Sequence, residues 1–277
     1  MRISAILRDV RILPISSLRL HEMTMRASTD KLKRMIRASR AQRSPILVDR
    51  RTRVVLDGMH RVAAFSELGY RNIMCQLVDY SARGLVAGAG HPSFSAKEPE
   101  AELAKLAVVQ PVPCGIGVRE LSASRCAFLL CRMQGGKRKC ALVSPSRRRM
   151  GLEGLVEAQR AVNLELAERH RIRYVAGHDC DEAMEAGRSV LFRRPFSKKE
   201  VISLATGGRL FPPKTTRHMF PVRILNINAP LGWLRLPPKK AEKKLHRLLR
   251  DALEHEEVRY YPEPVLVVDD ARFRKIE

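Results

Sequence analysis

Aromatic side chains and long apolar runs are both scarce in this chain. Only 5% of its 277 residues are Phe, Trp or Tyr, so it lacks the aromatic platform on which single-stranded nucleic acid stacks. No run approaches the roughly 18 apolar residues that a membrane-spanning helix needs. The apolar run within residues 1–9 is also too short for a signal peptide. These absences predict a cytoplasmic protein with no membrane partner.

Cysteine is sparse, with six residues at positions 75, 114, 126, 131, 140 and 180. None of them forms a Cys-x-x-Cys pair, which argues against a zinc site. Most lie in apolar runs typical of strands, where a free thiol behaves as a small hydrophobic group. We therefore expect reduced cysteines in the core.

Acidic residues are outnumbered: the chain has 29 Asp and Glu and 52 Lys and Arg, which gives a formal net charge of +23. Such an excess predicts attraction to polyanions and to small anions. The basic residues concentrate in 31–53 and 132–149. The charge alone therefore leaves open a nucleic-acid partner, a small anionic ligand or a solvated basic face, and the sequence also leaves a homodimer open.

The pattern of apolar residues predicts an α/β (α+β) protein with two domains and an extension. In the N-terminal domain, residues 1–92, we expect four strands at 11–15, 45–48, 53–56 and 72–78 and two helices at 29–40 and 60–68. A second α/β domain is expected over 93–235, followed by a C-terminal helical extension over 236–277.

The second half of the chain begins with residues 84–113, which are rich in small residues and predict a linker with a short helix near 96–107. A hairpin is expected at 127–131 and 140–143, around a Gly-Gly turn. Ser197 and Glu200 have the spacing of a capping box, so a helix should start there. Other expected elements are helices at 154–169, 180–185 and 239–256 and strands at 171–175, 189–193 and 264–268.

The most informative motif is Val54-Val55-Leu56-Asp57-Gly58-Met59-His60-Arg61. An apolar strand there runs through Asp-Gly into a helix. Free backbone N–H groups and the positive end of the helix dipole gather at such a corner, which therefore suits an anion. His60 and Arg61 add donors, whereas the carboxylate of Asp57 calls for a metal or an acceptor role.

Two further clusters carry chemistry. Lys214-Thr215-Thr216-Arg217-His218 follows two prolines that preclude a helix there. Its guanidinium could hold a carboxylate or phosphate, and its hydroxyls could bind an amine or a phosphoryl oxygen. An exposed polar turn is the simpler explanation. His21-Glu22 would be unremarkable alone, but phosphoryl transfer to an alcohol needs a carboxylate that accepts the hydroxyl proton.

With these residues in view, the N-terminal domain resembles the ParB/sulfiredoxin fold, in which residues 56–61 match the phosphate loop. Within that superfamily the chain resembles the free L-serine kinases, nearest to those of bacterial siderophore clusters. The match recurs in order at three motifs, residues 20–22, 57–61 and 213–218, and covers most of residues 10–221. The last motif is the most specific, because ParB and sulfiredoxin proteins lack it.

The resemblance implies a kinase that makes O-phospho-L-serine with ATP or ADP and Mg²⁺, for a siderophore or amino-acid pathway. Glu22 matches the catalytic base on the serine hydroxyl. Asp57 matches a carboxylate needed for catalysis, through Mg²⁺ or by orienting the hydroxyl. The matching nucleotide-phosphate cradle is Gly58, Met59, His60 and Arg61, and the matching substrate segment is Lys214, Thr215, Thr216, Arg217 and His218.

The chain departs from the family pattern at two positions. Met59 stands where family members often have His, and Gly90 stands where the archaeal members have an aromatic substrate contact. The chain also continues well past His218, as the siderophore-cluster members do, which favours ATP over ADP as the donor.

Three other functions compete with the kinase. A ParB-like DNA-binding or nucleotide-sensing regulator would explain the charge, although no helix-turn-helix pattern follows residue 80. A sulfinic acid reductase of the sulfiredoxin type would need a cysteine where Met59 stands, because a thioether cannot act as the thiolate nucleophile. An inactive relative that senses a nucleotide is the third.

Overall fold

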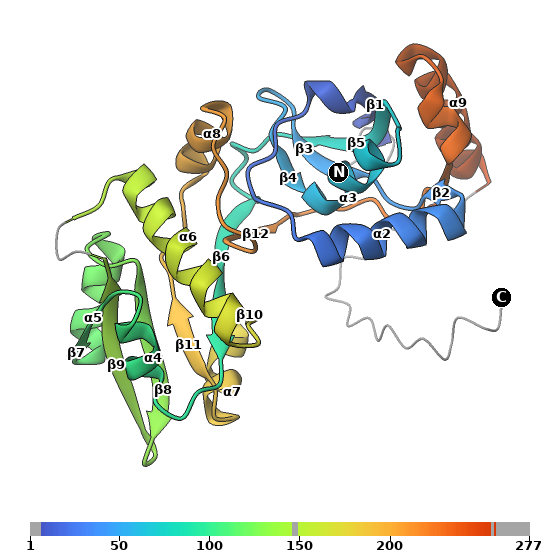
Figure 1. Cartoon of the computed structure of the whole chain (residues 1–277). Coiled ribbons are helices and arrows are strands. Elements are labelled where there is room, and N and C mark those ends of the chain that lie inside the picture. The colour runs from blue at the N-terminus through green and yellow to red at the C-terminus, as the bar shows by residue number, and fades with distance from the viewer. Residues whose placement is uncertain (1–6, 146–148, 256–257, 259–277) are drawn as a thin grey trace.

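The computed structural model describes residues 7–145, 149–255 and 258. It has a mixed α/β architecture with two lobes, which Figure 1 shows side by side. The strand β6 (Val86–Phe94) runs from the N-terminal lobe into the second one, and β12 (Thr216–Met219) lies along it between the lobes.

The N-terminal lobe is built on a four-stranded sheet in the order β1-β5-β3-β4. The strands β5 and β3 are parallel, and the two outer pairings are antiparallel. The strands are β1 (Val10–Pro14), β3 (Ile46–Asp49), β4 (Val55–Asp57) and β5 (Asn72–Val78). The helices are α2 (Arg26–Ser39) and α3 (Met59–Glu67), with a short 3₁₀ turn η1 (Ile15–Ser17). The elements expected here are thus confirmed, although α2 starts earlier than predicted.

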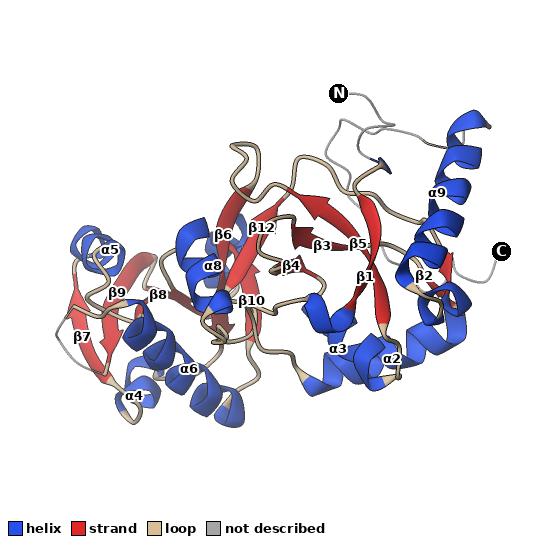
Figure 2. Cartoon of the chain, turned by 90° about the horizontal axis from the view of Figure 1, so that it is seen from above, coloured by secondary structure: helices blue, strands red, loops and turns tan. Residues whose placement is uncertain are grey.

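The last described helix, α9 (Pro238–Glu254), completes the core of the N-terminal lobe. Its buried face, Ala241, Leu245 and Leu249, joins the apolar side chains of β1, β3 and β5. Figure 2 shows α9 beside β1, at the end of the molecule away from the second lobe. The short elements β2 (Ala41–Gln42), β13 (Ala229–Pro230) and η3 (Leu231–Arg235) lie nearby. Residues 229–249 therefore pack with the first domain, whereas the sequence placed them in the second domain and in an extension.

The second lobe contains an antiparallel sheet in the order β10-β6-β11-β8-β9-β7, with β12 also paired to β6. Its other strands are β7 (Val108–Val112), β8 (Phe128–Gln134), β9 (Lys137–Ser144), β10 (Arg173–Ala176) and β11 (Ser189–Phe192). The helices are α4 (Pro99–Ala104), α5 (Cys114–Ser122), α6 (Leu152–Arg169), α7 (Cys180–Glu185) and α8 (Lys198–Thr206), with the turn η2 (Gly177–Asp179). The expected hairpin and the Ser197–Glu200 capping box are both present.

The expectation of a linker over 84–113 was wrong. Most of this segment is the long strand β6, the helix α4 and the strand β7. The short helix expected near 96–107 is confirmed, because α4 lies within that range. A segment rich in small residues resembles a linker in the sequence, because small side chains contribute little apolar surface to a core. In β6 they let other chain segments approach: a Cβ at Gly90 would lie 2.4 Å from the carbonyl oxygen of Lys214. The strand also crosses the boundary that we expected at residue 92.

The expectation that all six cysteines are reduced was also wrong. Cys114 and Cys140 form a disulfide between α5 and β9, while the other four are free and buried. Cys114 begins a helix that the sequence did not predict, so its place beside β9 could not be anticipated. The strand expected at 264–268 lies outside the described residues. In the described part of the chain, no helix is long and apolar enough to cross a membrane.

Candidate active site

Glu22 is the buried carboxylate on which this site is centred. A bridge between Glu22 and Phe211 brings the Pro212–Thr216 turn alongside it. The backbone N–H of Lys214 donates to Oε2 at 3.0 Å, and both the backbone N–H and the hydroxyl of Thr216 donate to Oε1. Glu22 is only 3% exposed, so these donors replace the water that a carboxylate would otherwise bind. Oε2 retains acceptor capacity, because each carboxylate oxygen can accept about two hydrogen bonds.

Two histidines lie near Glu22: His21 is buried, and His218, whose ring contacts that of His21, is half-buried. The Nδ1–H of His21 donates to the carbonyl oxygen of Val55, and its Nε2 lies 2.7 Å from the Thr216 hydroxyl. Burial lowers the pKa of His21, although the nearby Glu22 carboxylate opposes the effect. His218 bonds to the Tyr80 hydroxyl at 2.7 Å, and burial lowers the pKa of His218 to about 3. At neutral pH His218 is therefore uncharged.

The strand–glycine–helix corner, which we expected to suit an anion, lies where β4 meets α3. Gly58 adopts φ +100°, and a Cβ there would lie 2.5 Å from Ile46 Cγ2, so this turn requires glycine. His60, in the first turn of α3, accepts a hydrogen bond at 3.0 Å from the backbone N–H of Met25, which caps α2. Burial and the nearby Lys214 ammonium lower the pKa of His60. The start of α3, with its free N–H groups, thus faces the start of α2.

Asp57 is paired with two arginines at this corner. Its Oδ2 accepts from Arg61 at 2.8 Å and from Arg223 at 2.6 Å. Arg61 also donates to the carbonyl oxygens of Ser44 and Pro45, so its guanidinium braces the loop instead of pointing freely at a ligand. Arg223 is 44% exposed and lies at the surface of the site. It is the better placed of the two cations to meet a phosphate.

The structure brings most of the predicted residues together, with two exceptions. Lys214, Thr216 and His218 all contact the Glu22 cluster or influence its neighbours. Arg217 is exposed, because successive side chains of β12 alternate between faces and Arg217 takes the face opposite Thr216. Met59 packs against the N-terminal core, so only its backbone can serve an anion.

Sequence reasoning missed three residues of this region, Arg193, Tyr174 and Arg223. Arg193 is 1% exposed, and its Nη1 donates to the Thr215 hydroxyl. The one sequence signal for it was a charged residue at the end of the apolar strand expected over 189–193. Tyr174 comes from β10, and Arg223 follows β12. Neither position carried a local signal.

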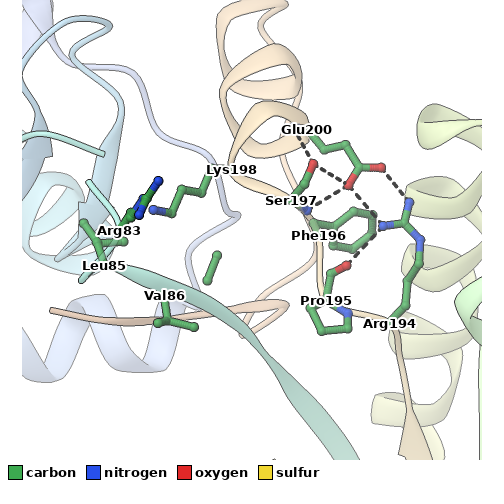
Figure 3. Close-up of a pocket in the computed structure, with 10 residues that line it drawn as sticks. Arg83, Leu85, Val86, Arg194, Pro195, Phe196, Ser197, Lys198 and Glu200 are labelled. Atoms are coloured by element: carbon green, nitrogen blue, oxygen red, sulfur yellow. Dashed lines mark hydrogen bonds and ion pairs between the residues drawn. The ribbon is translucent and has the colours of Figure 1, made fainter. Parts of the chain in front are cut away.

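A second, open pocket of about 480 Å³ lies between the start of β6 and the start of α8 (Figure 3). Two of its charged groups are paired with each other: Arg194 contacts both oxygens of Glu200, and Glu200 also closes the capping box with Ser197. Lys198 donates to the Ala82 carbonyl oxygen. Arg83 lines the opposite side of this pocket.

Within the described residues, no group of three or more His, Cys, Asp or Glu side chains is arranged so that it could hold a metal ion. Asp57 alone is still compatible with Mg²⁺, because Mg²⁺ in nucleotide sites takes one or two carboxylates and draws its other ligands from phosphates and water. Both arginine contacts use Oδ2 of Asp57, and Oδ1 is the oxygen that they leave for a metal.

Comparison with known proteins identifies proteins that are similar to this chain. No family model matches the chain. It is 27% identical over 237 residues to an ATP-dependent L-serine kinase of Desulfurococcus mucosus, covering 78% of this chain and 87% of that protein. It is 26% identical over 176 residues to the ADP-dependent L-serine kinase SerK of Thermococcus kodakarensis, covering 61% and 67%.

Solved structures share the fold. A glutamate-to-alanine variant of a free serine kinase in complex with ADP superposes with a TM-score of 0.68 at 22% identity, covering 82% of this chain and 94% of that one. SbnI of Staphylococcus aureus, with a C-terminal truncation, superposes with a TM-score of 0.67 at 18% identity, covering 91% and 100%. The resemblance to the free L-serine kinases that the three motifs indicated is thus confirmed over most of the chain.

Proposed function

We propose that this protein phosphorylates free L-serine to O-phospho-L-serine with ATP or ADP and Mg²⁺. The observation that carries the proposal is the meeting of three distant segments. Glu22 is held by the backbone of Lys214 and Thr216, and the Lys214 ammonium in turn lies close enough to His60 to affect its pKa. A buried base therefore lies beside an anion-binding helix start.

Each group has a defined task in this reaction. Oε2 of Glu22 accepts the proton of the serine hydroxyl, and the serine oxygen attacks the terminal phosphorus of the nucleotide. The bond from that phosphorus to the bridging oxygen breaks, and the nucleotide leaves with one phosphate fewer. Positioning and charge neutralisation carry most of the catalysis in phosphoryl transfer. The start of α3, Lys214 and Arg223 supply the positive charge.

Asp57 would hold the metal, and Arg61 keeps the carboxylate in place. A bound Mg²⁺ would offset charge on the phosphates. The remaining assignments also belong to this proposal: Gly58, His60 and the backbone of Met59 bind phosphate, and Thr216 and His218 shape the serine side of the site. The N-terminal lobe would be a ParB/sulfiredoxin-like nucleotide-binding domain. The product would supply a siderophore or amino-acid pathway, as the resemblance implies.

Phosphorus NMR of the purified protein tests the proposal directly. Incubation with L-serine, Mg²⁺ and either ATP or ADP should produce the resonance of O-phosphoserine, with ATP the expected donor. Omission of Mg²⁺ should abolish it. If neither nucleotide yields phosphoserine while L-serine and nucleotide are both shown to bind, the kinase proposal is wrong.

A nucleic-acid-binding regulator is the second candidate, favoured by one feature of α9. The solvent side of this helix carries basic residues along its whole length: Lys239, Lys240, Lys243, Lys244, Arg247 and Arg250. A DNA shift assay across a series of salt concentrations separates the two candidates. A steep salt dependence with sequence preference would support a regulator, whereas weak binding without preference would leave α9 a solvated face.

A further inference from the structure

Arg193 presents an unused pair of donors inside the protein. Its side chain is buried, and Nη1 donates to the Thr215 hydroxyl. Nε and Nη2 are also buried but have no hydrogen-bond partner among the described residues. These two nitrogens form one edge of the guanidinium, with parallel N–H groups. That edge matches the two oxygens of a carboxylate.

The Arg193 guanidinium lies in the neighbourhood of the candidate base. Thr215, which Arg193 contacts, stands between the two residues whose backbone N–H groups hold Glu22. Burial lowers the pKa of Arg193 to about 10, and electrostatic interactions with Tyr174 and Glu22 oppose that shift, so both groups are within electrostatic reach. A ligand on Arg193 would therefore be a neighbour of Glu22.

A buried cation with free donors needs a partner. Each unsatisfied buried donor costs on the order of 1–3 kcal/mol, and the Glu22 carboxylate is already engaged by the turn. The Phe128 ring, 5.2 Å from the guanidinium carbon, offers only its face. A ligand carboxylate would supply both the missing acceptors and the missing charge.

The other cations near the site are less suited to this task. Arg217 is exposed on the far face of β12, and Arg61 is committed to Asp57 and two carbonyl oxygens. Lys214 is exposed and lies near His60, on the phosphate side of the site. Arg193 thus replaces Arg217 as the candidate carboxylate clamp.

We propose that Arg193 binds the α-carboxylate of the amino-acid substrate through Nε and Nη2, an inference that rests on the proposed function. In serine only two carbons separate the carboxylate from the hydroxyl oxygen, so a carboxylate held by Arg193 keeps the hydroxyl close to Glu22. The site then selects free amino acids over alcohols that lack a carboxylate. Because Arg193 is buried, neighbouring side chains must move to admit the substrate.

Comparison of L-serine with L-serinamide tests this assignment, because serinamide lacks only the carboxylate charge. The wild-type protein should prefer L-serine by about 100-fold in kcat/KM, the scale of a lost charge-assisted bidentate pair. Arg193→Met should raise the KM for L-serine by a similar factor and remove the preference. Arg193→Lys should be intermediate, because an ammonium cannot offer two parallel donors.

Arg188→Met is the matched control. Arg188 also lies beside β11, but its donors are engaged by Ser93 and Ser95, so the serine preference should persist. Nucleotide affinity and thermal unfolding show whether each variant is folded. If Arg193→Met does not fold, Arg193→Lys is used for the comparison of serine with serinamide instead. Equal losses on serine and serinamide in both Arg193 variants would overturn the clamp. A wild-type protein that makes no phosphoserine would instead refute the proposed function.

Discussion

Thr216 contacts Glu22 twice, through its backbone N–H and through its hydroxyl, which lies 2.6 Å from Oε1. The two residues are 194 positions apart in the chain, so this contact ties the third motif to the first. The same hydroxyl lies 2.7 Å from Nε2 of His21. The carboxylate is thus oriented by the fold before any substrate binds, which is how a phosphoryl-transfer site reduces the cost of positioning.

Replacement of Glu22 by Gln should reduce phosphoserine formation by about 10²–10⁴-fold, because proton acceptance is lost while the shape of the side chain is kept. Nucleotide affinity should change little, since we propose that the phosphates bind at the start of α3, away from Glu22. Both are measured on the same preparation, by phosphorus NMR and by calorimetric titration with the nucleotide.

Glu153→Gln is the control for this variant. Glu153 is 64% exposed, and its one ionic partner among the described residues is Arg209 at the surface, so activity should be unaffected. Full activity of Glu22→Gln would show that another group takes the serine proton.

Gly58 and Gly69 form a matched pair for testing the phosphate corner. Both adopt positive φ, at +100° and +75°, but a Cβ at Gly58 would meet Ile46 whereas a Cβ at Gly69 has nothing within 4 Å. Ala at either position should cost about 1 kcal/mol of stability for its backbone conformation. Gly58→Ala should cost roughly a further 1–3 kcal/mol of overpacking and weaken nucleotide binding. Urea unfolding of both variants measures the difference, and equal losses would mean that the corner relaxes freely.

Local chemistry explains which parts of the site could be predicted from the sequence. The turn at Gly58 and the capping box of Ser197 and Glu200 depend on residues a few positions apart, and both form as expected. The strand β5 was also predicted, because its apolar run is bounded on both sides.

Long-range contacts explain the rest. Arg193 belongs to the site because it donates a hydrogen bond to Thr215, which is distant in the sequence. The strand β6 forms because β12 and β10 pair with it. The outward direction of Arg217 follows from alternation along β12, which can be used only once that segment is known to be a strand. Small residues and isolated charges do not reveal such partners.

The disulfide between Cys114 and Cys140 should contribute to stability in the oxidised protein. The two residues are 26 positions apart, and closing a loop of that size stabilises by about 3.5 kcal/mol in the chain-entropy description. Cys114→Ser should therefore lower the free energy of unfolding by about that amount without reductant, and by much less with it. Cys126→Ser is the comparison, since Cys126 is a free buried thiol. Mass spectrometry that finds six free thiols would contradict the pairing.

Two histidines with lowered pKa values, the buried His91 and the half-buried His218, predict a loss of stability in mild acid. Burial lowers the pKa of His218 to about 3 and that of His91 to about 4, whereas both titrate near 6.5 when unfolded. Below pH 6.5 these two histidines are protonated in the unfolded chain but not in the native state. The free energy of unfolding therefore falls as the pH drops from about 6.5 toward 4. The slope per histidine reaches at most about 1.4 kcal/mol per pH unit. Above pH 7 neither group affects the balance.

Urea unfolding at pH 7 and pH 5 measures this effect. His218→Gln should lose stability at both pH values, because its bond to Tyr80 is altered, but its difference between the two should be smaller than in the wild type. His178→Gln, at a side chain 74% exposed, should keep the wild-type difference. If His218→Gln also keeps the wild-type difference in stability between pH 7 and pH 5, then the native state protonates His218 as readily as the unfolded chain does. The prediction that His218 is uncharged in the folded site would then be wrong.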